Sequence, residues 1–514
     1  MSGSSIAGSG PIRALRREYE ESRLFRGLQR VWRGGGRKCR ESLLLGAFLR
    51  ESKLSAAWEA SVTCRLLALV LSLPGVLLHR LYLALKEKMD ESVLMGLIFE
   101  AGDGAALLES WLLLGLWVIP FARWDNGYHL MAFAAVLLLL YLRLMSRGGR
   151  LRVDRLGFFL CLFGGAVFLA IPVSYDPALS LRFLRYHLIC MACVITTVSA
   201  PRDRGDLLRL AGAAAFVVLV SSAWAAYQRI QGVEVVVAYV DASMNEGMPG
   251  RVQSYFDNPN TFAQVLVMLL PLTAAAMLGA RRWYSRLGAL LALVLGGLAL
   301  GMTYSRASWL GLLAAAGVFL LLWRPRLIPP ILLLGILCIP LLPDTILNRF
   351  LTIGQAGSDT TFTSRFPLYR AGAELLRRSP LTGAGLGTDA VRMYIFDHGI
   401  YDLMIYFGHL HDLYLEVWAE MGLLGLLSFL GAMLWGLKGM ARRCRRRGDP
   451  AVKTVAAACC AGTVGSLLTG VVDHVWAYPR VMCIFWFVFA LGLAAVRLLG
   501  EEGPREEKGG LPHV

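Results

Sequence analysis

The sequence predicts an all-α, polytopic integral membrane protein, and three observations lead to this prediction. Hydrophobic residues make up 56% of the 514-residue chain and charged residues only 17%, a balance unlike that of soluble domains. Apolar stretches long enough to cross a hydrocarbon core of about 30 Å recur along the chain. The basic residues behind the formal charge of +16 cluster in short runs between these stretches, as topology signals do. No nucleic-acid partner is implied.

Twelve candidate spans follow one another along the chain. They cover about residues 105–122, 127–142, 156–173, 183–200, 207–226, 261–280, 285–303, 307–323, 327–343, 413–437, 454–471 and 481–498. Every second connection carries arginine or lysine, within residues 143–155, 202–204, 281–286, 324–326 and 438–447. Because such runs remain in the cytoplasm, these connections and both termini are predicted to be cytoplasmic. The large polar loop between the ninth and tenth spans is therefore predicted to lie outside.

Composition divides the chain into five parts. They are a cytoplasmic basic amphipathic region (1–100), spans one to nine (101–343), an extracytoplasmic loop predicted to be catalytic (344–411), spans ten to twelve (412–500) and a cytoplasmic tail (501–514). The first part mixes arginine with leucine, tryptophan and phenylalanine, which predicts short helices on anionic membrane lipids. Its apolar piece 66–85 is interrupted by Pro74, His79 and Arg80 and is predicted to be interfacial. A loop as long as 344–411 is usually functional.

Three arginines lie on the predicted outer face, where positive charge is disfavoured. Arg251 lies in GRVQSYFDNPNTFAQ, before the sixth span, and Arg306 in TYSRASWLGL, between the seventh and eighth. Arg365 lies in the long loop, in TSRFPLYRAGAELLRRSPLTGAGLG. A guanidinium group binds phosphate oxygens through paired hydrogen bonds and keeps its charge. The three arginines together predict an anion site; the alternative is that each caps a helix or pairs with an acid.

The tenth span begins with a cluster of ionisable residues, HLHDLYLEVWAE. His411 is the best candidate for proton transfer, because an imidazole titrates near neutral pH and accepts a hydroxyl proton. Asp412, Glu416 and Glu420 recur at every fourth residue and would share one helix face. We expect this face to line a polar cavity with His411 at its mouth, since membrane carboxylates seek such places. The alternative places the acids at the membrane interface. Supporting roles are predicted for His409, Asn260, Asp412 and Glu416.

No cofactor or metal is predicted. The chain has no HExxH, no paired CxxC and no aspartate-rich box on the outer face, and it has no Walker A loop. An activated donor outside the cytoplasm must therefore arrive attached to lipid. The glycines of PLTGAGLG could cradle a phosphate group through their N–H groups or form a tight turn.

These segments resemble the O-antigen ligase and polymerase superfamily of bacterial membrane glycosyltransferases. The resemblance rests on RVQSYFDNPNTFAQ, TYSRASWLGL, SRFPLY, RSPLTGAGLG and His411-Asp412 followed after nine residues by GLLG. It is specific from about Arg251 to Leu427 and leaves out the first hundred residues. It implies a GT-C-like enzyme of the bacterial cytoplasmic (inner) membrane that works without a metal in cell-envelope polysaccharide biosynthesis.

The resemblance also implies the substrates and the residue roles. The donor would be an undecaprenyl-diphosphate-linked glycan, and the acceptor a hydroxyl group of a glycan or glycolipid. His411 would activate that hydroxyl, Arg251 and Arg306 would hold the pyrophosphate, and Arg365 would serve donor binding or a loop lid. Asp412 stands where the family commonly has an amide or small polar residue, which would raise the basicity of His411 or reflect a different acceptor.

Three alternatives remain open from the sequence. One is a polymerase that extends a glycan on the same lipid carrier, since the shape of the acceptor cavity separates the two activities. Another is a non-enzymatic transporter of a lipid-linked glycan, which would use the arginines and histidine only for binding. The last is a membrane-anchored scaffold whose basic N-terminal region docks a cytoplasmic partner.

Overall fold

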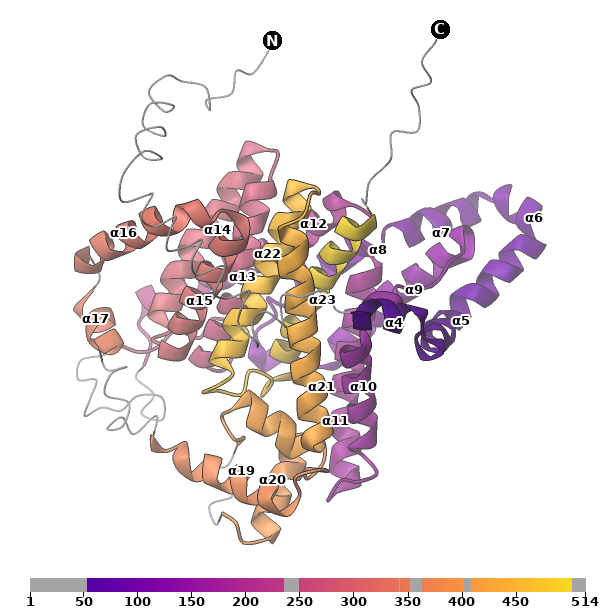
Figure 1. Ribbon diagram of the computed structural model, residues 1–514. Helices are drawn as coiled ribbons and strands as arrows, with labels where there is room; N and C mark the ends of the chain where they lie inside the picture. The colour runs from indigo at the N-terminus through magenta and orange to yellow at the C-terminus, as the bar shows by residue number, and fades with distance from the viewer. Residues whose placement is uncertain (1–52, 235–248, 342, 352–362, 402–407, 502–514) are drawn as a thin grey trace, which may run out of the picture. The chain divides into compact units, whose positions relative to one another are not determined.

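Helices and turns account for all of the secondary structure in the residues that the computed structural model describes, which are 53–234, 249–341, 343–351, 363–401 and 408–501. The all-α prediction is confirmed for this part of the chain (Figure 1). The chain separates into two units, residues 1–54 and 55–514, and every contact described below lies within the second. Predictions for residues 1–52 and 502–514 fall outside the described residues.

Between residues 53 and 234 the helices are α4 (Lys53–Ala60), α5 (Val62–Ala84), α6 (Lys86–Asp90), α7 (Val93–Asp103), α8 (Ala105–Leu116), η2 (Phe121–Arg123), α9 (Gly127–Arg147), η3 (Val153–Arg155), α10 (Phe158–Leu169), α11 (Pro177–Ser199) and α12 (Arg204–Gln231). Those after residue 248 are α13 (Pro259–Gly279), α14 (Trp283–Met302), α15 (Arg306–Trp323), η5 (Pro325–Leu327), α16 (Ile328–Cys338), η6 (Ile339–Leu341), α17 (Asp344–Leu351), α19 (Phe366–Arg378), α20 (Thr388–Asp397), α21 (Leu413–Cys444), α22 (Pro450–Thr469) and α23 (Pro479–Glu501).

Three of the long helices begin with the same local signal, an aspartate or asparagine followed by proline. The side chains of Asp176, Asn258 and Asp449 accept hydrogen bonds from N–H groups of the first turns of α11, α13 and α22. The capping oxygen satisfies a donor that has no partner within the helix, and the following proline lacks one such donor and has a helical φ already. These dipeptides therefore fix where the helices start.

Ten helices among the described residues are long and apolar enough to cross a membrane, namely α5, α9, α11 to α15 and α21 to α23. Nine of them coincide with predicted spans. The other three predicted spans, at 105–122, 156–173 and 327–343, contain the shorter helices α8, α10 and α16. The tenth long helix is α5, which includes the piece 66–85 predicted to be interfacial. The polytopic membrane fold is confirmed, and the count of twelve spans stays a prediction.

The described part of the predicted N-terminal region contacts the helical bundle through α5 and α7. Both α5 and α7 contact α9. The hydroxyl group of Tyr141 on α9 donates to the carbonyl of Leu71 at 2.9 Å, and the ring of His79 lies 2.7 Å from the carbonyl of Met145. Two helices of the predicted N-terminal region, α5 and α7, thus pack directly on α9.

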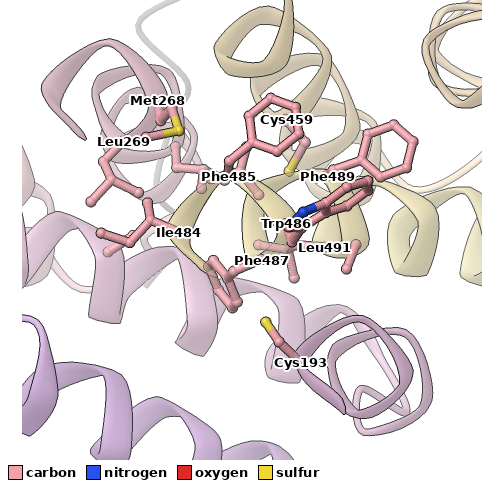
Figure 2. Close-up of a cluster of buried hydrophobic side chains, with 14 of the residues drawn as sticks. Cys193, Met268, Leu269, Cys459, Ile484, Phe485, Trp486, Phe487, Phe489 and Leu491 are labelled. Carbon is pink, nitrogen blue, oxygen red and sulfur yellow. The ribbon is translucent and has the colours of Figure 1, made fainter. Parts of the chain in front are cut away.

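The centre of the bundle is α23, which is apolar on every side and almost entirely buried. Figure 2 shows its side chains in contact with neighbours from three other helices. The residues labelled there are Cys193, Met268, Leu269, Cys459, Ile484, Phe485, Trp486, Phe487, Phe489 and Leu491. A helix that is hydrophobic all round belongs in the interior. Because α13 and α22 pack against this central helix, their first and last turns are held in fixed positions.

The described part of the long loop folds into helices. Both α19 and α20 pack against α21 and against each other (Figure 1). Apolar residues of these elements form a second buried cluster, which we call the loop core. It includes Leu368, Leu375, Val391, Ile395, Leu410 and Ala419. Because Leu410 lies in the connection that leads into α21, its burial in the loop core helps to fix the position of this connection.

The helix α21 is interrupted at Gly422, whose φ of 65° and ψ of −169° are not helical. The carbonyl of Leu381 comes so close that a Cβ atom at Gly422 would lie 1.9 Å from it, so only glycine fits. The N–H groups of Ala384 and Gly385 donate to carbonyl groups of α21 at 2.7 and 3.2 Å. The segment PLTGAGLG is therefore a tight turn inserted at the break, and these N–H groups are not open to a phosphate.

Candidate functional site

His411 lies at the junction between the long loop and α21. The next residue, Asp412, caps the helix, since its carboxylate accepts a hydrogen bond from the N–H group of Leu415 at 2.7 Å. His411 has a φ of +52°, in the left-handed region that residues other than glycine rarely adopt. Such conformations persist only where surrounding contacts hold them, and they are concentrated at functional sites.

The partner of His411 is Asp473, 62 residues further along the chain. Nδ1 of His411 lies 3.2 Å from Oδ1 of Asp473. The side chain of Asp473 is only 11% exposed, whereas that of His411 is 33% exposed. With Nδ1 held by a buried carboxylate, Nε2 is the ring nitrogen that can exchange a proton with a substrate.

The first turns of α13 connect this pair to Arg251. Nε2 of Gln264 donates to Oδ2 of Asp473 at 3.1 Å. Asn260, four residues earlier on the same helix face, accepts a hydrogen bond from Arg251 at 2.5 Å. Arg251 is buried and also donates through Nε to the carbonyl of Thr303 at 2.7 Å. Four residues of helix, about 6 Å, therefore separate the anchor of Arg251 from the anchor of Asp473.

Strained backbone marks the same region. Arg306 opens α15 directly after the corner that Arg251 contacts, and this corner contains Tyr304 with a φ of +52°. Ser254, three residues after Arg251, has a φ of +54°. Together with His411, these are all of the non-glycine residues with positive φ in the part of the chain that the structure describes. Each of them lies within three residues of a predicted site residue.

The helix α19 ties the two turns of the site together. Arg365, at its N-terminus, donates from Nη1 to the carbonyl of Val472, which is next to Asp473. One turn later, the hydroxyl group of Tyr369 donates to the carbonyl of His411 at 3.3 Å. The structure therefore brings Arg365 to the His411–Asp473 pair.

Asp473 carries the negative charge of this region. Burial raises the pKa of Asp473, but the hydrogen bond from His411 and the charge of Arg365 outweigh burial and hold the pKa well below its usual range. The adjacent histidines are kept neutral. Burial, with charge repulsion from neighbouring histidines, lowers the pKa of His409, and burial lowers the pKa of His474 to about 3. His411 is therefore next to a fixed carboxylate and two neutral rings.

The acidic face predicted on α21 is buried against the loop. Glu416 is fully buried, and its carboxylate accepts a hydrogen bond from the N–H group of Leu410 at 2.7 Å. The carboxylate of Glu420 accepts one from the N–H group of Gly387. The prediction that this face lines a polar cavity is wrong for Glu416 and Glu420, because the main chain of the loop covers both carboxylates. Glu416 instead holds the turn that contains His411.

His409, His411 and Asp473 are also the described residues that could hold a metal ion, since each offers one ligand atom and these atoms lie within 4.8 Å of one another. The sequence shows no metal-binding spacing here because Asp473 comes from a different connection. Both carboxylate oxygens already accept hydrogen bonds, from His411 and the N–H group of His474 on one and from Gln264 on the other. This pattern fits an orienting carboxylate, and the absence of a metal stays a prediction.

Sequence reasoning did not assign Asp473, Gln264 or Tyr369 to the site. The sequence feature that could have identified Asp473 is its position in a short connection that is predicted to lie on the same face of the membrane as His411. Gln264 was a polar side chain in an otherwise apolar span. Conversely, Asp412, proposed from the sequence to act on His411, binds the main chain of α21 as a cap.

Residues 291–430 match a family model described as O-antigen ligase. They form an O-antigen ligase domain. This domain runs from α14 through the long loop into α21, so it contains Arg306, Arg365 and His411, whereas Arg251 and Asp473 come from outside it. No curated protein matches the chain. The match supports the O-antigen ligase superfamily for this part of the chain, and that family suggests a membrane enzyme of polysaccharide biosynthesis that acts on lipid-linked glycans.

Proposed function

We propose that this protein transfers a glycan from undecaprenyl diphosphate to a hydroxyl group of a glycan or glycolipid, at the outer face of a bacterial cytoplasmic membrane. The observation that carries the proposal is the His411–Asp473 pair beside Arg365, with His411 and Arg365 inside the O-antigen ligase domain. The reaction must remove a proton from the acceptor and stabilise a leaving diphosphate. A base oriented by a carboxylate, with guanidinium groups nearby, supplies both.

In the proposed reaction, the acceptor oxygen bonds to the anomeric carbon of the glycan while the bond from that carbon to the diphosphate oxygen breaks. Nε2 of His411 takes the hydroxyl proton, and Asp473 stabilises the imidazolium ion through Nδ1. The electron pair of the broken bond leaves with undecaprenyl diphosphate. Arg251 and Arg306 stabilise the charge of this leaving group, and Arg365 binds the donor or closes the loop over it.

The remaining predicted residues support these groups. Asn260 holds the guanidinium group of Arg251, and Glu416 holds the N–H group between the two histidines. His409 accepts the N–H group of His411 at 3.2 Å, and Asp412 caps the following helix. None of these four would touch the reacting atoms.

The proposed topology has twelve spans, cytoplasmic termini and a catalytic loop formed by residues 344–411 on the outer face. The packing of α19 and α20 on the outer end of α21 supports a folded loop that covers the site. A polymerase would use the same residues and differ in the acceptor, so the acceptor must be varied in the test.

The test is glycan transfer in proteoliposomes, with extracted lipid-linked glycan, a panel of glycan and glycolipid acceptors, and EDTA throughout. His411→Ala and Arg306→Ala are expected to lower the transfer rate by at least about a hundredfold while the protein remains folded. His398→Ala is the matched histidine control, because His398 stacks on Tyr394 in the same loop, and it should retain the wild-type rate. Wild-type transfer by the His411 variant would show that the assigned base is wrong, and loss of transfer in EDTA would overturn the metal-free reaction.

A further inference from the structure

A groove lies between α12, α13 and α14, at the end of the bundle remote from the site. Its volume is about 640 Å³. Its lining includes four small residues, Gly212, Ala215, Ala276 and Gly288, and the larger apolar side chains of Phe216 and Leu219. Because α13 starts near Arg251 and ends at this groove after 21 residues, about 30 Å of helix separates the groove from the site.

The groove exists because α12 and α14 diverge toward this end. They are in contact at Gly296, where a Cβ atom would lie 2.8 Å from Cγ1 of Val218. Two helical turns closer to the mouth, a Cβ atom at Gly288 would meet nothing within 4 Å, and the same holds at Gly212 on α12. The space between the helices is therefore open to a ligand from outside.

Positive charge surrounds the mouth. Arg209 is paired with Asp206 at 2.5 Å, and Arg282 donates to the hydroxyl group of Tyr284 at 2.5 Å. Arg281 is exposed and has no hydrogen bond or ion pair with any described residue. The first turn of α14, which starts here, has neither an acidic residue nor a side-chain cap, so its N–H groups add to the positive potential. The mouth suits an anion.

Aromatic residues place this mouth at the level of lipid headgroups. Trp283 and Tyr284, in the first turn of α14, are 75% and 51% exposed. Exposed tryptophan and tyrosine are enriched where membrane meets water. Phe216, on the groove wall below, is 47% exposed and offers an apolar surface to an acyl chain. The arginine runs predict this end to be cytoplasmic, and that leaflet holds the anionic lipids.

We propose that this groove binds one anionic phospholipid of the phosphatidylglycerol class. The phosphate group lies at Arg281 and Arg282, and an acyl chain follows the wall formed by Phe216 and Leu219. A zwitterionic lipid brings an ammonium group to the same arginines and binds less tightly. The proposal does not depend on the proposed transferase function, because the groove is a helix length away from His411.

The test is native mass spectrometry of the full chain in detergent, titrated with dioleoyl-phosphatidylglycerol or dioleoyl-phosphatidylcholine. Wild-type protein is expected to retain phosphatidylglycerol about tenfold more tightly than phosphatidylcholine. The charge variant Arg281→Gln/Arg282→Gln, and the filling variants Gly288→Leu and Gly212→Leu, should each weaken phosphatidylglycerol binding about tenfold. The control Arg324→Gln/Arg326→Gln removes two arginines from another predicted cytoplasmic turn and should change binding less than about twofold.

Three outcomes would overturn the proposal. Equal retention of the two lipids would exclude a site for anionic headgroups. Equal loss in the control would show that total positive charge, and not this groove, attracts the lipid. If glycerol phosphate displaces the lipid at equimolar concentration, the site recognises a soluble phosphate and the acyl chain adds nothing. If both leucine variants fail to fold, the Arg281→Gln/Arg282→Gln variant still tests the proposal, because both arginine side chains are exposed and their replacement should leave the fold intact.

Discussion

Two polar turns meet at the site, and they contribute in different ways. The turn before α21, residues 409–412, provides the proton acceptor, while its acid, Asp412, caps a helix. The turn before α23, residues 473–478, provides the acid that contacts His411. Arg480, in the first turn of α23, is buried and donates to the carbonyl groups of Ile119 and Tyr255 at 2.7 and 2.9 Å. Asp412, next to His411 in the sequence, binds the backbone of α21, whereas Asp473, 62 residues further along, binds the imidazole ring.

Asp473→Asn should have the largest effect. It removes the charge that stabilises the imidazolium ion and allows the wrong tautomer of His411, so kcat should fall about 10²- to 10³-fold with an acceptor KM changed less than about threefold. Transfer kinetics in proteoliposomes measure both constants. A purely structural role for Asp473 would instead lower the amount of folded protein and leave the kcat of the folded fraction unchanged.

Arg480→Met should have the next largest effect, on stability. It removes the charged donor from two partly buried carbonyl groups and leaves that of Tyr255 with only the N–H group of Phe121, so the free energy of unfolding should fall by about 3 kcal/mol. Chemical unfolding in detergent micelles measures the change. The control is Arg377→Met, since the Arg377 side chain is 73% exposed and its ion pair with Glu374 adds little. A similar loss in both variants would contradict the role of Arg480 as a buried anchor.

Gln264→Leu should have a smaller effect on the reaction. It removes one of the hydrogen bonds that orient Asp473 and leaves the charge, so kcat should fall about tenfold. Thr273→Val is the matched control on α13, because the Thr273 hydroxyl bonds only to a carbonyl of its own helix. If the control is as slow as the Gln264 variant, the effect comes from α13 in general.

Asp412→Ala should have the smallest effect and separates the two aspartates. Loss of the cap should cost about 1 kcal/mol of stability, and kcat should stay within about threefold of wild type. Asp412→Ser, which can still cap, should recover most of the stability. A loss of kcat as large as that of Asp473→Asn would show that Asp412 acts on His411 directly.

The sequence predicted what local pattern controls. Helical spans follow from apolar length, and the starts of α11, α13 and α22 follow from aspartate or asparagine before proline. Arg251, Arg306 and Arg365 were singled out because the positive-inside rule disfavours arginine on the predicted outer face, and His411 because an imidazole titrates near neutral pH.

The partners of these residues could not be predicted, because they depend on packing between distant segments. Gln264 and Asp473 are 209 residues apart and meet because α13 and α22 pack against each other and against α23. The burial of Glu416 depends likewise on how the loop docks. The short lengths of α8, α10 and α16 could not be predicted either, because hydropathy identifies an apolar stretch but does not show where its helix ends.

The break at Gly422 gives the site a mechanical property. It divides α21 into an outer segment, whose Leu415, Trp418 and Ala419 contact the loop core, and an inner segment inside the bundle. His411 is attached to the outer segment, whereas Asp473 precedes Val475 of the main core. The two segments are not separate bodies, because Leu413, Val417 and Met421 of the outer segment also belong to the main core, and the N–H group of Leu413 donates to the carbonyl of Gly470 at 2.8 Å. The break thus lets one short helical segment attach to the loop core and, through Tyr414, to the end of α22, so the spacing between the imidazole and its carboxylate is fixed from both sides.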